Sequence, residues 1–110
     1  MEVSTDHTVE ELHAFVKQSG GLVVIDCYAA WCAPCKRLAM LLPKIAKDHK
    51  KVQFIKVNAD QNNNIAQYFK VRSFPNVIFL KEDSNGGVVE LNRVVGLNLE
   101  KIKNLIKEYE

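Results

Sequence analysis

The most constraining feature of the sequence is an apolar run at residues 22–29, followed almost directly by two cysteines, Cys32 and Cys35. A run that is apolar almost throughout is typical of a strand buried on both faces, as at the centre of a parallel sheet. From Pro34 to about Asp48 the chain is rich in Leu, Ala, Lys and Met at helical spacing. The two cysteines are therefore expected where a buried strand meets the start of a long helix.

Changes in hydrophobic spacing predict the other elements. Thr8 and Glu11 form a capping-box pattern before a helix that runs to about Ser19. Pro43 lies inside the long helix, and we expect it to bend the axis without breaking it, because the amphipathic pattern resumes at once. Further predictions are strands at residues 52–57, 77–80 and 88–95, a short helix through Phe69, and a last helix capped by Asn98.

This order of elements predicts an α/β fold with a central mixed β-sheet flanked by helices on both faces. Residues 84–87, Ser-Asn-Gly-Gly, tolerate a positive φ, so the last two strands should pair antiparallel. At 110 residues, the chain is expected to form a single domain over residues 1–110.

Charge and composition exclude several classes of function. A formal net charge of +2, with lysine and glutamate interspersed, leaves no basic stripe for nucleic acid and no polybasic membrane patch. Residues 1–12 are acidic and polar, whereas a secretory signal needs a basic start and an apolar stretch. We therefore expect a cytoplasmic protein without nucleic acid or membrane partners, in which three cysteines do not form a structural disulfide framework.

The spacing of the two cysteines favours redox chemistry. Cys32 lies just before a helix whose first-turn amides lack intrahelical partners, and these donors favour a thiolate. Pro34, near the helix start, removes no hydrogen bond that the helix needs. Cys35 is one turn deeper and returns toward Cys32, so it can attack a mixed disulfide that Cys32 forms with a substrate.

The alternative for such a pair is half of a zinc site. A zinc site needs about four ligands, typically with a second paired set at a distance. The other candidate ligands are Cys27, His7, His13 and His49, and none of them is paired at ligand spacing. We therefore expect no metal.

Asp26 lies within the predicted buried strand. Burial of an ionised carboxylate is costly, so its pKa should be raised, and it could take and return the Cys35 proton through water. The alternative is a shallower strand with Asp26 solvated at its edge. Cys27 points to the opposite face and is expected to be a packed, inert thiol.

Two further residues are candidates for substrate contact. Trp31 at the strand end should be exposed, where it would shield the reactive cysteine and offer a contact surface, although core packing is the alternative. Pro75 opens the third predicted strand and withholds a ladder donor, which indicates either an edge strand or an unpaired backbone position. If its peptide bond is cis, the Phe74 backbone would lie beside the thiols, ready to pair with an extended peptide.

Nearly the whole chain resembles the thioredoxin family. The resemblance rests on Asp26, WCAPCK at residues 31–36, Pro43, KVNADQN at residues 56–62, the Phe74-Pro75 pair and Val95-Gly96. It implies the thioredoxin fold and a protein-disulfide reductase that works by dithiol–disulfide exchange and contributes to cell redox homeostasis. A reactive first thiolate is already known for this family.

The resemblance also implies the roles of individual residues. Cys32 would be the attacking thiol and Cys35 the resolving one, and together they would form the redox-active disulfide. Asp26 would be the buried proton acceptor, with Lys56 nearby, and Pro75 a cis proline. The residues expected to border the substrate groove are Trp31, Ala33, Pro34, Phe74, Pro75 and Gly96.

The family resemblance further implies the partners of the protein. No cofactor would be bound, and electrons would come from a flavin-containing, NADPH-dependent thioredoxin reductase. They would pass to disulfides of proteins such as peroxiredoxins, methionine sulfoxide reductases or ribonucleotide reductase. We expect a monomer.

Three features depart from the family pattern. Ala33 replaces the usual Gly and adds a methyl group at the rim, which affects reductase docking or redox poise but not the exchange chemistry. Asn76 replaces the customary Thr after the cis proline, and the turn at residues 82–87 is slightly long. Both bear on substrate preference.

Three classes of function therefore remain. The first is a general dithiol reductase, favoured by Pro34 and by the absence of an export signal. The second is an oxidase or isomerase module like those of protein disulfide isomerase, which typically has a histidine in place of Pro34. The third is a noncatalytic binding subunit. Loss of either active cysteine would favour this class, but both cysteines are present.

Overall fold

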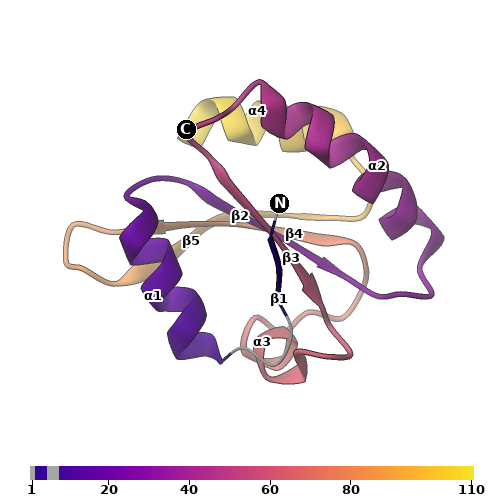
Figure 1. The fold of residues 1–110 in the computed structure, drawn as a ribbon, viewed down its shortest axis with the longest axis horizontal. Coiled ribbons are helices and arrows are strands. Elements are labelled where there is room, and N and C mark those ends of the chain that lie inside the picture. Colours follow the sequence, from indigo (N-terminus) through magenta and orange to yellow (C-terminus); the bar gives the residue numbers. More distant parts are fainter. Residues whose placement is uncertain (1, 5–7) are drawn as a thin grey trace.

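The computed structural model describes residues 2–4 and 8–110, in which a five-stranded sheet is covered by helices on both faces (Figure 1). Helices α1 (Val9–Ser19) and α3 (Asn63–Tyr68) lie on one side of the sheet. Helices α2 (Ala33–Lys47) and α4 (Leu99–Tyr109) lie on the other. This arrangement confirms the predicted α/β class with a mixed central sheet.

The sheet has the strand order β1-β3-β2-β4-β5. Strand β2 occupies the centre, where it pairs parallel with β3 and antiparallel with β4. Strands β1 and β3 are parallel, and β4 and β5 are antiparallel. The strand bounds are β1 Glu2–Ser4, β2 Val23–Tyr28, β3 Gln53–Asn58, β4 Asn76–Glu82 and β5 Val88–Val95.

Two hydrophobic layers follow from the alternation of side chains along β2. Val24 packs on the α2/α4 side with Leu38, Phe79 and Ile102, whereas Val23 and its neighbours pack on the α1/α3 side. Asp26 is two residues from Val24 and therefore lies on the α2/α4 face, beneath the helix that carries the cysteines. Cys27 leaves the sheet on the opposite face, as predicted.

The ends of the helices show the predicted caps. Thr8 Oγ1 accepts the Glu11 amide at 3.1 Å, and Glu11 Oε1 accepts the Thr8 amide at 2.9 Å, which completes the capping box. Asn98 caps α4 by accepting the Lys101 amide at 3.1 Å. Helix α2 continues through Pro43 without a break, as its amphipathic pattern predicts.

The structure adds three details to the predicted mixed sheet. Strand β1 was not predicted, because only three residues form it and it depends on backbone pairing with β3. Strand β2 is not flanked by parallel strands alone, since β4 runs antiparallel beside it. Strand β4 is not at the edge, because it lies between β2 and β5. Pro75 immediately precedes β4, so its missing N–H falls outside the ladder.

Within residues 2–4 and 8–110, we find no helix with both the length and the apolar character needed to span a membrane.

Candidate active site

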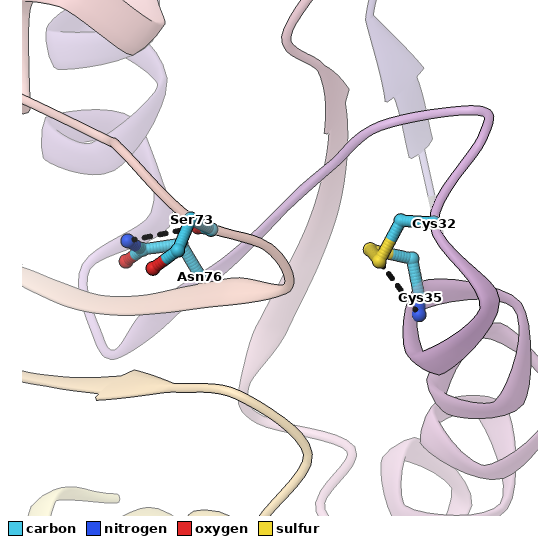
Figure 2. Close-up of a disulfide and its surroundings, with 4 residues drawn as sticks. All are labelled: Cys32, Cys35, Ser73 and Asn76. Carbon is cyan, nitrogen blue, oxygen red and sulfur yellow. Dashed lines mark hydrogen bonds between the residues drawn. A yellow bond between two sulfur atoms is a disulfide. The ribbon is translucent and has the colours of Figure 1, made fainter.

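Cys32 and Cys35 lie at the start of α2 and are joined in a disulfide, with their Cα atoms 5.2 Å apart (Figure 2). Cys32 is the N-cap of the helix, and its sulfur accepts the Cys35 amide N–H at 3.2 Å. The two side chains are only 5% and 3% exposed. The sulfur of Cys32 thus takes the place that a Ser or Asp oxygen takes in an ordinary helix cap, as its position in the sequence predicts.

The first turn of α2 presents its outer face to solvent. Ala33 and Pro34 are both exposed and lie directly between the two cysteines. Pro34 has no N–H to offer, but helix amides in the first turn have no intrahelical acceptor in any case. The motif therefore combines a regular helix start with a buried dithiol and an exposed rim.

Asp26 is 1% exposed, and neither of its carboxylate oxygens has a hydrogen-bond partner. Burial raises the pKa of Asp26 from 3.8 to about 6, and the positive charge of Lys56 opposes part of that rise. The prediction of a buried carboxyl with an elevated pKa is confirmed. The alternative of a carboxylate solvated at the strand edge is wrong, because β2 is central and covered on both faces.

Lys56 lies directly opposite Asp26 in the register of β2 and β3. Its ammonium group lies 4.8 Å from the centre of the Tyr28 ring, a cation–π distance. Lys56 and Cys35 both line a small open pocket of about 90 Å³, together with Tyr28 and Ala39. A volume of this size has room for water between the dithiol and the Lys56 side chain.

Cys27 is a free thiol and is 1% exposed, packed with Ala59 and Ala66 under Phe74. Burial, together with the negative charge of Asp26, raises the pKa of Cys27 to about 12. A thiol that stays protonated and inaccessible is not a nucleophile at neutral pH. The prediction of a packed, inert thiol is confirmed.

Trp31 and Phe74 form an aromatic pair next to the disulfide. Trp31 is 72% exposed, and its ring meets the Phe74 ring edge-on with centroids 5.8 Å apart. Phe74 also packs against the cluster of Ala29, Cys32 and Cys35. The expected exposure of Trp31 is confirmed, and the alternative prediction, that its side chain packs in the core, is wrong.

The loop before β4 lies across from the disulfide (Figure 2). The Phe74-Pro75 peptide bond is cis, and the Pro75 carbonyl accepts the Gly96 amide at 2.8 Å. Gly96 has a φ of 92°, a conformation that disfavours a side chain. This hydrogen bond ties the end of β5 to the loop, so Phe74, Pro75 and Gly96 come together beside Cys32 and Cys35.

Asn76 is a residue of this site that the sequence marked only as a departure from the family. It is 2% exposed, its Nδ2 donates to the Ser73 carbonyl at 3.5 Å, and its Oδ1 has no partner (Figure 2). The sequence signal that could have identified Asn76 is its position directly before the apolar segment Val77–Leu80. A polar side chain next to a buried strand is expected to need a hydrogen-bond partner.

The structure does not gather the candidate zinc ligands. In the described part of the chain, no group of three or more His, Cys, Asp or Glu side chains could hold a metal ion. His13 packs against Tyr68, and His49 pairs with Glu110 at 2.8 Å. His7 lies outside the described residues.

A buried strand that ends at a dithiol, with the first sulfur capping the next helix, defines a thiol–disulfide oxidoreductase. The family model described as Thioredoxin matches residues 3–108. The chain belongs to the thioredoxin family, and its Cys32–Cys35 pair makes it a dithiol–disulfide reductase.

Individual relatives agree with this assignment. The sequence is 40% identical to Thioredoxin H3 of Arabidopsis thaliana, over 96% of this chain and 93% of that protein. The structure of Trichomonas vaginalis thioredoxin matches with a TM-score of 0.92 at 37% identity, covering 100% of this chain and 97% of the other. A second structure, with a TM-score of 0.84 at 27% identity over 98% of this chain and 94% of the other, concerns thiol resolution in yeast mitochondrial 1-Cys peroxiredoxin via the glutathione/thioredoxin systems.

Proposed function

We propose that the protein reduces disulfides of other proteins with Cys32 as the attacking thiol and Cys35 as the resolving thiol. The observation that carries this assignment is the cap of α2, where the Cys35 amide points at the Cys32 sulfur at 3.2 Å. In the reduced protein, that amide and the positive end of the helix dipole stabilise a thiolate on Cys32. Cys35 is inside the first turn, with its sulfur turned back toward Cys32.

The exchange proceeds in two displacements. The Cys32 thiolate attacks one sulfur of the substrate disulfide, forms a Cys32–substrate disulfide and releases the other substrate sulfur as a thiolate. Cys35 then loses its proton and attacks the Cys32 sulfur, which releases the second substrate sulfur. Two electrons leave the protein, the substrate gains two thiols, and Cys32 and Cys35 end as a disulfide.

Asp26 is proposed as the acceptor of the Cys35 proton. A carboxyl group with a pKa of about 6 is ionised at neutral pH but still basic enough to take a proton from a thiol. The proton would pass through water in the pocket of about 90 Å³ beside Cys35 and Lys56. Lys56 would keep the carboxylate ionised between turnovers, since its charge lowers the pKa of Asp26.

The substrate is proposed to lie along the rim made by Trp31, Ala33 and Pro34 on one side and the 74–75 loop with Gly96 on the other. An extended peptide segment could pair with the backbone at Phe74. Pro75 has no N–H with which to donate a hydrogen bond there, so it would not compete with the peptide. The exposed Trp31 ring, supported by Phe74, offers apolar contact area near the reacting sulfur.

The proposed electron donor is a flavin-containing, NADPH-dependent thioredoxin reductase. The proposed acceptors are peroxiredoxins, methionine sulfoxide reductases and ribonucleotide reductase, and the peroxiredoxin study among the similar structures supports the first of these. We place the protein in the cytoplasm as a single-domain monomer. The cytoplasm keeps thiols reduced, which agrees with a free Cys27 and with a dithiol that must be regenerated by reduction.

An insulin reduction assay driven by dithiothreitol tests the catalytic assignment. The wild-type protein should accelerate insulin precipitation, and Cys32→Ser should abolish the acceleration. Cys35→Ser should instead accumulate mixed disulfides, visible as higher-mass adducts on nonreducing gels and identifiable by mass spectrometry. Insulin reduction by Cys32→Ser at the wild-type rate would contradict the assignment.

The reduction potential separates a reductase from an oxidase or isomerase. A value of about −270 mV, known for thioredoxin, supports a reductase, whereas a value of about −180 mV, known for protein disulfide isomerase, supports an isomerase. Equilibration of the dithiol with a glutathione or dithiothreitol redox buffer measures this quantity directly.

A further inference from the structure

Asn76 occupies a position that no part of the exchange chemistry uses. It is the first residue of β4 and lies opposite Cys27 of β2 and Val95 of β5. Directly opposed residues leave a sheet on the same face, so Asn76 and Cys27 both point to the α1/α3 side, away from Asp26. Asn76 therefore lies under the 73–75 loop and not in the path of the Cys35 proton.

The Asn76 amide is only loosely engaged. Its Nδ2 donates to the Ser73 carbonyl at 3.5 Å, the long limit for a hydrogen bond, and its Oδ1 has no partner although the side chain is 2% exposed. A long hydrogen bond returns little free energy, while a buried acceptor without a partner is costly. Stability of the free protein therefore does not account for an amide at this position.

A second buried asparagine in the same protein shows the contrast. Asn62 is 1% exposed, and its Nδ2 donates to the Asn58 carbonyl at the shorter distance of 3.2 Å. Its Oδ1 is not among the unpartnered buried atoms of the described residues. Asn62 is thus a well-partnered amide that ties the start of α3 to the end of β3, as a structural asparagine should.

The loop that Asn76 touches is the one that borders the disulfide. Figure 2 shows Ser73 and Asn76 at the two ends of a turn whose apex faces Cys32 and Cys35. Phe74, between these two ends, packs against the cluster that contains both cysteines, and the Pro75 carbonyl accepts the Gly96 amide at 2.8 Å. The Ser73 end of the loop is therefore held by Asn76, and the Pro75 end by the stronger bond to Gly96.

We propose that Asn76 is a positioning residue for protein substrates: it holds the 73–75 loop through the Ser73 carbonyl, and this contact tightens when a polypeptide docks. The proposal rests on the proposed function, in which an extended segment pairs with the backbone at Phe74. Hydrogen bonds at catalytic sites are often long in the free enzyme and shorten in the complex. An interaction that is stronger in the complex contributes to substrate binding and not to the stability of the free protein.

The test compares a polypeptide disulfide with a small one. Insulin must dock on the loop, whereas 5,5′-dithiobis(2-nitrobenzoate) can reach the Cys32 thiolate without it. Asn76→Ala should raise the KM for insulin about fivefold, the equivalent of about one hydrogen bond, and leave kcat for insulin and the nitrobenzoate rate within about twofold of wild type. Asn76→Val, which suits a strand, carries the same expectation if Asn76→Ala does not fold.

The stability of the variants provides the second readout. Asn76→Val removes the unpartnered oxygen and should keep or raise the thermal midpoint, whereas Asn62→Ala should lower the midpoint and leave the KM for insulin unchanged. An unchanged KM for Asn76→Val, or a parallel fall in the insulin and nitrobenzoate rates, overturns the positioning role. Failure of the wild-type protein to reduce insulin would instead overturn the proposed function itself.

Discussion

Asp26 and Lys56 lie directly opposite each other on the neighbouring strands β2 and β3, with their side chains on the same face of the sheet. Two opposing effects meet in this pair. Burial, the larger one, raises the pKa of Asp26, and the positive charge of Lys56 lowers it, so that it reaches about 6. The charge of a carboxyl group beneath the dithiol therefore changes close to neutral pH.

Substitution of Asp26 by asparagine should stabilise the protein and slow its chemistry. The difference between a pKa of about 6 and the ordinary 3.8 corresponds to about 3 kcal/mol, which Asp26→Asn should add to the free energy of unfolding at pH 7. Insulin reduction at neutral pH should slow, because the Cys35 proton loses its proposed acceptor. Denaturant unfolding and initial rates measure the two effects.

The pH dependence of that stability difference has a definite sign. Because burial raises the pKa of Asp26 in the folded state, the folded protein keeps this proton to a higher pH than the unfolded chain. Wild-type stability should therefore fall as pH rises from about 4 through about 6, and the advantage of Asp26→Asn should vanish near pH 4. The exposed Asp60→Asn serves as the control. If Asp26→Asn reduced insulin at the wild-type rate across neutral pH, the proposed role of Asp26 as proton acceptor would be contradicted.

Removal of the Lys56 charge should shift the titration of Asp26 in the opposite direction. Lys56→Met keeps most of the side-chain volume but deletes the charge that lowers the pKa of Asp26. The midpoint of the Asp26 titration should move upward, which carboxyl carbon NMR measures. Lys36→Met, at another residue lining the same pocket, is the matched control. A midpoint that stays near 6 would show that burial alone sets the value.

The elements around the dithiol could be predicted because their signals are local. The apolar run at residues 22–29 became β2 (Val23–Tyr28), and the capping box at Thr8 and the cap at Asn98 start helices as expected. The burial of Asp26 followed from the same run, since a carboxylate within a two-sided strand has no route to solvent. Each of these predictions needed only residues that are neighbours in the sequence.

The features that could not be predicted depend on contacts between distant segments. Strand β1 forms by pairing with β3, more than fifty positions away in the register Glu2 to Ile55, and its three residues carry no pattern of their own. The place of β4 between β2 and β5 is likewise set by pairing partners. A different reason applies to the contact from Asn76 to Ser73, which joins residues only three positions apart. It requires the loop geometry itself, which the residue types do not specify.

The three cysteines should differ sharply in their reactivity. After reduction with dithiothreitol, iodoacetamide at mildly acidic pH should alkylate Cys32 first, because the helix start favours its thiolate. Cys27 should stay unmodified in the folded protein, since burial raises its pKa to about 12. Tandem mass spectrometry locates the label, and alkylation in guanidinium provides the control in which all three react. Labelling of Cys32 no faster than an unstructured cysteine peptide would argue against an ionised sulfur.

Loss of the Phe74 ring should affect docking more than chemistry. Phe74→Ala removes the edge-on partner of Trp31 and part of the packing over Cys32 and Cys35. Aromatic pairs of this kind contribute about 1 kcal/mol, so the KM for insulin should rise about fivefold. Trp31 is the single tryptophan of the chain, so its fluorescence anisotropy should fall in this variant as the ring loses its support.

A matched control for Phe74→Ala exists in the other aromatic cluster. Tyr68 is 54% exposed and meets the rings of His13 and Phe69 edge-on, but it packs on neither cysteine. Tyr68→Ala should therefore cost a similar amount of stability while leaving both the KM for insulin and the anisotropy of Trp31 at their wild-type values. Of these two aromatic side chains, Phe74 is the one that contacts Trp31 and packs on the cluster that holds Cys32 and Cys35. If the two variants changed the KM for insulin equally, the effect of Phe74→Ala would therefore reflect a general loss of stability and not a contact with the substrate.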